Sequence, residues 1–328
     1  MAMLDTTLSF IKDRILIAFL LLMIVIGAFA APNFLSVVNV RNMLLQSAVL
    51  GIVAAGVTFV VINGGIDFSV TSQMSLVTVV GASIITLEGG LIANPVYSIP
   101  VAIVVMLSIG LGFGAVNGIA VTRLNMPSFI TTLATMMLGQ GIATLYTRAS
   151  TISNLPEQFI AISRTRIFDI IPIPFLLLVA VIVVTQFVLR KTVFGRRMYY
   201  IGTNPEVARI SGMPVKRNVF RLFLISGICA GLAGAILLSR LASGAPAHGE
   251  QFFLDIIVAI TIGGGSVLGG KGDTFGTTLG VFFIVIMNTI LGLFGVSWFV
   301  INIIKGALIL LSAGLDSVKR MATEGQGT

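Results

Sequence analysis

The chain has 328 residues, of which 56% are hydrophobic and only 10% are charged, and its mean hydropathy is +1.07. A soluble domain carries about 25% charged residues and has no core large enough for so much apolar surface, so the composition excludes a soluble globular protein and indicates one that lipid solvates. The single Cys229 and the single His248 exclude an intramolecular disulfide and a metal site rich in Cys or His, and the net charge of +8 sits in the breaks between apolar runs, which favours a role in membrane orientation over nucleic-acid binding.

Ten apolar runs, taken in chain order, have about the 17–25 residues that a bilayer-spanning helix needs. They lie near 15–31, 43–62, 69–87, 97–121, 128–147, 171–189, 219–240, 253–268, 275–295 and 297–314. The runs predict an all-α polytopic membrane protein of about ten transmembrane helices, in a single domain over residues 1–328. Two breaks between runs are short and rich in glycine, Asn63–Phe68 and Gly269–Asp273. Each is either a tight turn at the membrane surface or unwound backbone inside the protein.

The positions of Lys and Arg predict the orientation of the chain, because cytoplasmic loops carry an excess of both. An even number of spans places the N and C termini on one side. If that side is cytoplasmic, Lys305 lies within the last span, and the Lys and Arg residues left outside are Arg41, Arg148, Arg164, Arg166 and Arg240. All the others fall inside. The bias favours cytoplasmic termini.

A faint internal echo indicates two units of five helices each. Asn117 precedes Phe129 in Pro-Ser-Phe-Ile, and Asn288 precedes Phe299 in Ser-Trp-Phe-Val. The two stretches are five predicted spans apart, and an odd offset gives units of opposite topology, as in many transporters. An inverted repeat and chance similarity both account for the echo.

Two glycine-rich stretches imitate nucleotide-binding motifs. Gly265–Gly272 matches a phosphate loop except that Gly272 stands where Ser or Thr is required, and it follows an apolar run rather than a strand. The glycines from Gly110 lack a surrounding βαβ unit. Since Gly110, Gly114 and Gly118 share one helix face, close packing of helices is the better interpretation, and Gly227/Gly231 and Gly276/Gly280 repeat the spacing. The chain is therefore expected to bind no cofactor itself, and its energy comes from a gradient or a partner.

The loop at about 190–218 is the longest predicted on the inner side and is strongly basic. Within it, residues 204–212 predict one short helix, because an Asn cap, a Pro in the first turn and an acidic residue at the positive end are followed by a closing Gly. Its apolar side chains fit either a groove of another protein or the lipid headgroups. The residues are Asn204, Pro205, Glu206, Val207, Ala208, Arg209, Ile210, Ser211 and Gly212.

Polar residues inside the spans are candidates for a solute path or for hydrogen bonds between helices. The candidate lining is Asn63, Asp67, Ser69, Asn117 and Asn288. Asp67 also fits a cap of the third span, and Lys305 either neutralises a carboxylate such as Asp255 or reaches toward a membrane surface. Buried carboxylates are too few to favour a proton- or sodium-coupled carrier. No cluster of acids, histidines or cysteines gathers at the end of a span, so the sequence contains neither a catalytic site nor a metal site.

Several motifs in one order resemble the permease subunits of ribose-type bacterial ABC importers for simple sugars, over nearly the full length of the chain. They are Gly64-Gly-Ile-Asp-Phe-Ser-Val70, Asn117-Gly118 with Met126-Pro-Ser-Phe-Ile-Thr-Thr-Leu133, the stretch Phe194–Gly212, Leu254-Asp255 with Ile262–Gly272, and Lys305-Gly306. The chain departs from the family pattern at Thr71, Gln251–Asp255 and Gly265, which leaves open which sugar or sugar-like solute is carried.

The resemblance implies a homodimer of ten-helix subunits in the bacterial inner membrane, in contact with membrane lipid. It also implies a cytoplasmic ATPase that binds the ATP and contacts the helix at 204–212, and a periplasmic sugar-binding protein that docks near 148–170 and 242–252. The expected mechanism is alternating access. A stand-alone secondary carrier or facilitator for a neutral polar solute is the alternative.

Overall fold

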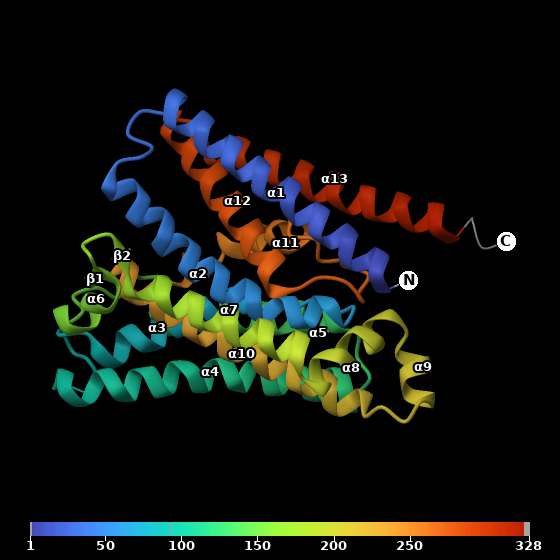
Figure 1. The fold of residues 1–328 in the computed structure, drawn as a ribbon. Coiled ribbons are helices and arrows are strands. Elements are labelled where there is room, and N and C mark those ends of the chain that lie inside the picture. The colour runs from blue at the N-terminus through green and yellow to red at the C-terminus, as the bar shows by residue number, and fades with distance from the viewer. Residues whose placement is uncertain (1, 93, 325–328) are drawn as a thin grey trace.

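The computed structural model describes residues 2–92 and 94–324, with side chains described for residues 16–92, 94–312 and 314. Helices dominate the chain (Figure 1), and the two short strands pair antiparallel with Arg166 opposite Pro172. The elements are α1 (Ala2–Ala30), α2 (Val37–Ile62), α3 (Val70–Ile85), α4 (Pro95–Arg123), α5 (Ser128–Thr147), α6 (Glu157–Arg164), β1 (Arg166–Ile167), β2 (Ile171–Pro172), α7 (Ile173–Lys191), α8 (Val193–Thr203), α9 (Pro205–Ile210), α10 (Val215–Leu241), the 3₁₀ turn η1 (Pro246–Gly249), α11 (Phe252–Ile262), α12 (Thr274–Leu293) and α13 (Trp298–Glu324). The all-α membrane fold is confirmed.

Six helices of the described chain are long and apolar enough to cross a membrane, namely α2, α4, α5, α7, α10 and α12. Shorter apolar stretches lie in α1, α3 and α13, at Leu16–Ala30, Val70–Ile85 and Trp298–Ser312. The count of ten transmembrane helices therefore stays a prediction, and six helices of the described residues have the length and composition of a full span.

The eighth predicted run, 253–268, differs most from the structure. Its helix α11 has 11 residues and ends at Ile262. At 1.5 Å per residue α11 is about 16 Å long, roughly half of the hydrocarbon thickness of a bilayer. Residues 263–273 are not helical, because Gly263 ends the helix and Gly264, Gly269, Gly270 and Gly272 adopt positive φ angles. Of the two interpretations of the breaks, unwound backbone packed against protein applies here, as the contacts below show.

The core of the bundle is formed around α2 and α10. In the most apolar 18-residue stretch of each helix, 89% of the residues of α2 and 72% of those of α10 are buried within the chain. In α4 and α7 the buried share is only 22%. The outward faces of α4, α5 and α7 carry large aliphatic and aromatic side chains such as Val104, Leu145 and Val183. These faces suit contact with lipid or with another protein chain.

The glycine stripes bring helix backbones together. A Cβ added at Gly110 would overlap the carbonyl oxygen of Gly227, and one added at Gly114 would overlap that of Phe223, so α4 and α10 meet backbone to backbone. In the second half, a Cβ at Gly280 would overlap the carbonyl oxygen of Ala259 on α11. The packing interpretation of these glycines is confirmed.

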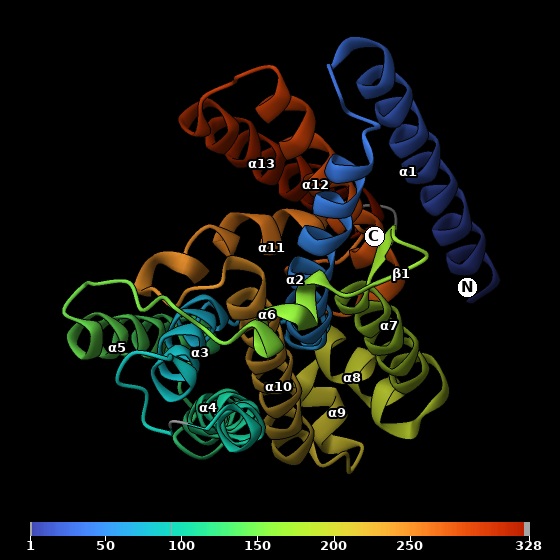
Figure 2. The ribbon, with the colours of Figure 1, turned by 90° about the vertical axis from the view of Figure 1, so that its left-hand side faces the viewer.

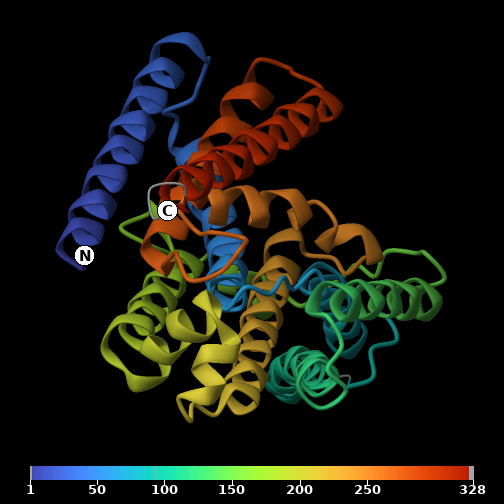
Figure 3. The same cartoon turned by 90° about the vertical axis from the view of Figure 1, so that its right-hand side faces the viewer.

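The two ends of the bundle differ in what they carry. The hairpin β1–β2 and α6 lie at one end, which faces the viewer in Figure 2. Helices α8 and α9, the start of α1 and the end of α13 lie at the opposite end, which faces the viewer in Figure 3. We call these the outer end and the inner end. The start of α1 and the end of α13 thus lie on the side of α8 and α9, as an even number of crossings requires, while the cytoplasmic placement of that side remains a prediction.

Candidate functional site

The non-helical segment between α2 and α3 places a buried carboxylate inside the bundle. Oδ1 of Asp67 accepts hydrogen bonds from the backbone N–H of Ser69 (3.1 Å) and from its hydroxyl (2.5 Å). Oδ2 accepts one from the hydroxyl of Ser226 on α10 (2.7 Å). These donors replace water around the buried carboxylate. The cap position of α3 belongs to Ser69, so the sequence interpretation of Asp67 as the cap is displaced by two residues.

Asn117 of α4 extends this group into the first polar network. The hydroxyl oxygen of Ser69 accepts hydrogen bonds from Nδ2 of Asn117 (2.8 Å) and Nε2 of Gln73 (2.7 Å). The hydroxyl of Thr135 on α5 donates to Oδ1 of Asn117 (2.8 Å). Asp67, Ser69 and Asn117, which were predicted to line a path, thus meet in one place, each at most 2% exposed. In this conformation the three side chains are closed to a solute, and access to them requires the network to open.

Asn288, another predicted lining residue, belongs to a second polar network. Nζ of Lys305 on α13 lies 2.5 Å from Oδ1 of Asp255 on α11, and both side chains are buried. Nδ2 of Asn288 on α12 donates to Oδ2 of Asp255 (3.3 Å). Of the two roles open to Lys305 from the sequence, the structure shows neutralisation of a carboxylate. The ion pair and the hydrogen bond of Asn288 together join α11, α12 and α13 inside the bundle.

Asn63 lies apart from both networks. It is the C-cap of α2, where its backbone N–H donates to the carbonyl oxygen of Val61. Its side-chain oxygen is buried and has no hydrogen-bond partner among the described residues. The five predicted lining residues are therefore divided among three places, and of them only Asp67, Ser69 and Asn117 share one hydrogen-bonded network.

A cavity of about 40 Å³ lies between α2, the start of α3 and α11. Most of its wall is aliphatic, while Asp67, Thr71 and Thr261 supply the polar groups. The rings of Phe68 and Phe253 pack at one side with their centroids 5.2 Å apart. The sequence interpretation, which looked for polar side chains, missed both aromatic residues. The signals for Phe68 were its position at the end of the first break and within the motif Gly64–Val70. The lining residues are Val57, Val61, Ile66, Asp67, Phe68, Val70, Thr71, Phe253, Ile256, Ile257, Ile260, Thr261 and Val267.

The short helix predicted at 204–212 is present as α9, at the inner end (Figure 3). Oδ1 of Asn204 accepts from the backbone N–H groups of Glu206 (3.1 Å) and Val207 (3.0 Å), and Gly212 follows the helix with φ of +75°. Arg209 pairs with Glu206 and holds the pKa of that carboxyl below its usual range. Ala208 faces the protein, whereas Val207 and Ile210 are 57% and 76% exposed. The capping pattern is confirmed, and two aliphatic side chains face away from the bundle.

The rest of the predicted inner loop is more ordered than the sequence indicated. Residues Val193–Thr203 form α8, which Thr192 caps by accepting the backbone N–H of Gly195 (3.1 Å). The loop at 190–218 therefore contains two short helices joined at Asn204, and α8 packs into the bundle with Met198 and Ile201 buried.

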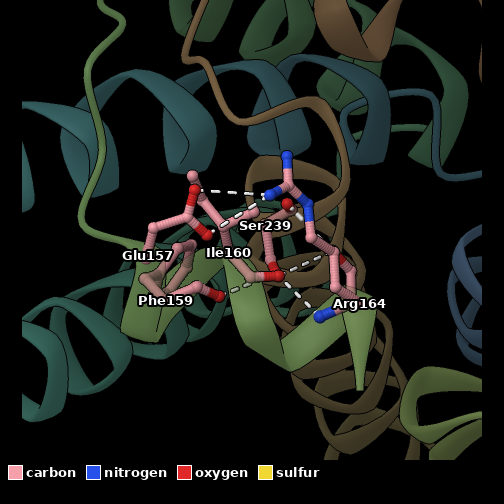
Figure 4. Close-up of polar contacts among 6 residues, drawn as sticks. Glu157, Phe159, Ile160, Arg164 and Ser239 are labelled. Carbon is pink, nitrogen blue, oxygen red and sulfur yellow. Dashed lines mark hydrogen bonds and ion pairs between the residues drawn. The ribbon is translucent and has the colours of Figure 1, made fainter. Parts of the chain in front are cut away.

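The outer end is joined to α10 through α6. The hydroxyl of Ser239 donates to the carbonyl oxygen of Phe159 (2.8 Å), and Ser163 binds Ser239 through its N–H (3.1 Å) and its hydroxyl (2.9 Å). Figure 4 shows this contact beside the exposed pair Glu157–Arg164. Ile152 and Gly244 form a β-bridge, so the two outer loops predicted near 148–170 and 242–252 are held together.

These features define a class of protein. Among the described residues, no three His, Cys, Asp or Glu side chains gather to hold a metal ion. A multi-pass helical bundle with buried polar networks, a cavity between helices and an exposed helix at one end has the features of a membrane transport component.

Comparison with known proteins agrees with this class. The family described as "Branched-chain amino acid transport system / permease component" matches residues 39–313. The ribose import permease protein of Bacillus subtilis is 38% identical over 301 residues, covering 92% of this chain and 91% of its own. The galactose/methyl galactoside import permease protein of Salmonella typhimurium is 36% identical (95% and 96% covered), and the xylose transport system permease protein of Escherichia coli is 32% identical (88% and 86% covered). No solved structure matches the chain.

The chain belongs to this family of transport permease components, as a relative of the permeases of bacterial ABC sugar importers. The resemblance noted from the motifs is confirmed, and so is the expectation that the chain is not an enzyme. It is a multi-pass membrane protein.

Proposed function

We propose that this chain is the membrane-spanning subunit of an ATP-driven importer for a monosaccharide. The observation that carries the proposal is α9, a capped helix at the inner end whose aliphatic side chains, Val207 and Ile210, face away from the bundle. In a permease that itself lacks a nucleotide site, an exposed helix of this kind supplies a contact for a separate ATPase. The ribose, galactose and xylose named for its relatives support a simple sugar as the solute.

The proposed assembly follows from the two ends of the bundle. A cytoplasmic ATPase, which binds the ATP, contacts Asn204–Gly212 at the inner end. A periplasmic sugar-binding protein docks at the outer end, where α6 and the bridge at Ile152 and Gly244 form one surface. A second copy of the permease completes a path between two subunits in the bacterial inner membrane. The basic inner loop and the bias in Lys and Arg support a cytoplasmic inner end.

The proposed path passes the cavity beside Asp67. By alternating access, it opens first to the outer end and then to the inner end. Neutral hydroxyl and amide groups, from Ser69, Asn117 and the more distant Asn63 and Asn288, match a polyol better than an ion. The aliphatic wall of the cavity makes binding weak, which suits a permease whose selectivity resides in an outer binding protein. A path that held the sugar tightly would delay its release.

The experiment that tests the proposal compares two variants, each with an exposed aliphatic residue replaced by glutamine, one in α9 and one outside it. The tagged chain is purified with its ATPase and tested for uptake of labelled ribose, galactose and xylose into liposomes with the binding protein. Ile210→Gln removes apolar contact area from α9, and we expect the ATPase to co-purify about tenfold less, corresponding to roughly 1.4 kcal/mol of lost contact energy. Leu124→Gln, at the end of α4 and 67% exposed, is the matched control.

Two outcomes contradict the proposal. Equal recovery of the ATPase with Ile210→Gln and with wild type removes α9 from the contact. Sugar uptake by the chain alone, without ATP, identifies a stand-alone carrier or facilitator instead.

A further inference from the structure

The end of α8 touches both non-helical breaks of the bundle. Gly202 lies next to the last residue of α8 and two residues before Asn204, the cap of α9. A Cβ added at Gly202 would overlap the carbonyl oxygen of Ile62, the last residue of α2, and would lie 2.8 Å from the backbone nitrogen of Gly270. Both neighbours are backbone atoms, which cannot move aside as a flexible side chain does. The chain leading into α9 therefore rests directly on α2 and on the 263–273 segment.

The two breaks are also bonded to each other at this point. The backbone N–H of Gly270 donates to the carbonyl oxygen of Ile62 (2.7 Å). A Cβ at Gly269 would lie 2.6 Å from the carbonyl oxygen of Gly202 and 2.9 Å from Cα of Gly64. We call Gly64, Gly202, Gly269 and Gly270 the glycine junction. Three segments distant in the sequence meet there without an intervening side chain, so a displacement of one is not absorbed by rotamer changes.

Two further contacts fix the 263–273 segment, one to α8 and one to the end of α7. The hydroxyl of Tyr199 donates to the carbonyl oxygen of Gly272 (2.8 Å). Burial, together with the nearby Asp273, raises the pKa of Tyr199 to about 12, so the hydroxyl stays protonated and remains a donor at neutral pH. Arg190, at the end of α7, pairs with Asp273 (2.6 Å). Helix α8 and this segment are therefore held as one body.

Both breaks continue from the junction into the wall of the cavity. Ile66, Asp67 and Phe68 line it from the first break, and Val267 lines it from the second. Moving the junction thus moves the wall on two sides. By contrast, Val207 and Ile210 of α9 are exposed, and α9 packs chiefly against α8 and α10.

We propose that Gly202 is a positioning residue through which α8 transmits displacement of α9 to the two breaks and so opens the cavity toward the inner end. This inference rests on the proposed function, since it requires a partner that moves α9. The motion is a small shear of packed segments, of the kind that links rigid bodies in other proteins. Transport then depends on backbone contact at Gly202 as well as on the contact between α9 and its partner.

The test measures sugar taken up per ATP hydrolysed, in liposomes containing the full complex with its ATPase and binding protein. Gly202→Ala inserts a methyl group between α8 and the breaks. We expect a fall in this ratio of about 5- to 150-fold, the range typical of coupling between two sites, with the ATPase still co-purifying. Gly112→Ala is the matched control, because a Cβ at Gly112 in α4 meets nothing within 4 Å.

Tyr199→Phe keeps the test decisive if Gly202→Ala does not fold, because it removes one hydroxyl and adds no atom. We expect it to lower the same ratio by about two- to tenfold, in line with the loss of one hydrogen bond. An unchanged ratio in Tyr199→Phe together with a wild-type or unfolded Gly202→Ala overturns the inference and leaves the proposed function standing. A wild-type complex whose uptake is independent of ATP overturns both.

Discussion

The first and second polar networks hold buried carboxylates by different means. Asp67 is surrounded by neutral donors, the N–H and hydroxyl of Ser69 and the hydroxyl of Ser226, and no ion pair to it is observed among the described residues. Asp255 is paired with the cation of Lys305 and receives one longer bond from Asn288. The asparagine comes from α4 in the first network and from α12, the helix directly after α11, in the second. The two buried carboxylates therefore have different electrostatic surroundings.

The difference separates a network that can be rearranged from one that is fixed. Hydroxyl and amide groups exchange partners at modest cost, because each both donates and accepts. A buried ion pair loses much more when one partner leaves, since the other charge remains in a medium of low dielectric constant. We therefore expect the first network to rearrange during transport, and the second network to keep α11, α12 and α13 in a fixed arrangement.

The largest effect is expected from breaking the ion pair. Lys305→Met leaves Asp255 buried without its cation, and we expect a loss of about 3–5 kcal/mol of unfolding free energy. The measurement is denaturant unfolding in detergent micelles, with Lys191→Met, an exposed lysine at the end of α7, as control. The double variant Lys305→Met/Asp255→Asn should recover most of the loss, because it leaves no unpaired charge. A single variant as stable as wild type would show that the pair does not stabilise the arrangement of α11, α12 and α13.

A smaller effect is expected from neutralising the first network. Asp67→Asn keeps the shape of the side chain but sets an amide N–H₂ or a weaker acceptor against the donors of Ser69 and Ser226. We expect a loss of about 1–3 kcal/mol in stability, together with reduced sugar uptake. Unfolding and uptake are measured on the same preparation, with the exposed Asp169→Asn as control. If Asp67→Asn costs as much as Lys305→Met, the distinction between the two networks is wrong.

The smallest effects come from removing one donor from each carboxylate. Ser226→Ala deletes a 2.7 Å bond to Asp67 and should cost about 1 kcal/mol. Asn288→Ala deletes a 3.3 Å bond to Asp255, which keeps Lys305, and should cost less in lost hydrogen bonding than Ser226→Ala does. Ser108→Ala, at an exposed position on α4, corrects for the loss of a hydroxyl that bonds its own helix. The reverse order of the two effects would indicate that the ion pair depends on Asn288.

The sequence predicted the features that depend on local pattern. Asn204, Pro205 and Gly212 act within one short stretch, so the start and end of α9 follow from capping chemistry alone. The glycine stripe from Gly110 marks one face of one helix, and its consequence for packing does not depend on knowing the partner. Length and apolar composition were enough to recognise candidate membrane spans at α2, α4, α5, α7, α10 and α12.

The features that sequence reasoning missed depend on contacts between distant segments. Ser226 reaches Asp67 across 159 positions of the chain, and Tyr199 reaches Gly272 across 73, distances over which no periodicity carries information. The apolar run that continues α11 past Ile262 reads as helix until its glycines are seen to adopt positive φ angles against Gly64 and Gly202. Asp67, Ser69 and Asn117 were selected by polarity, but their meeting required the fold.

Helix α10 runs from one end of the molecule to the other. Its 27 residues span about 40 Å, starting three positions after Gly212 and ending beside Ser239, where α6 is bonded to it. Because α10 is a continuous helix with contacts at both ends, a displacement at one end is transmitted to the other. Docking of a loaded binding protein at the outer end and ATP hydrolysis at the inner end are thus expected to be coupled through the backbone of α10. Such coupling would keep ATP hydrolysis low until a solute is delivered.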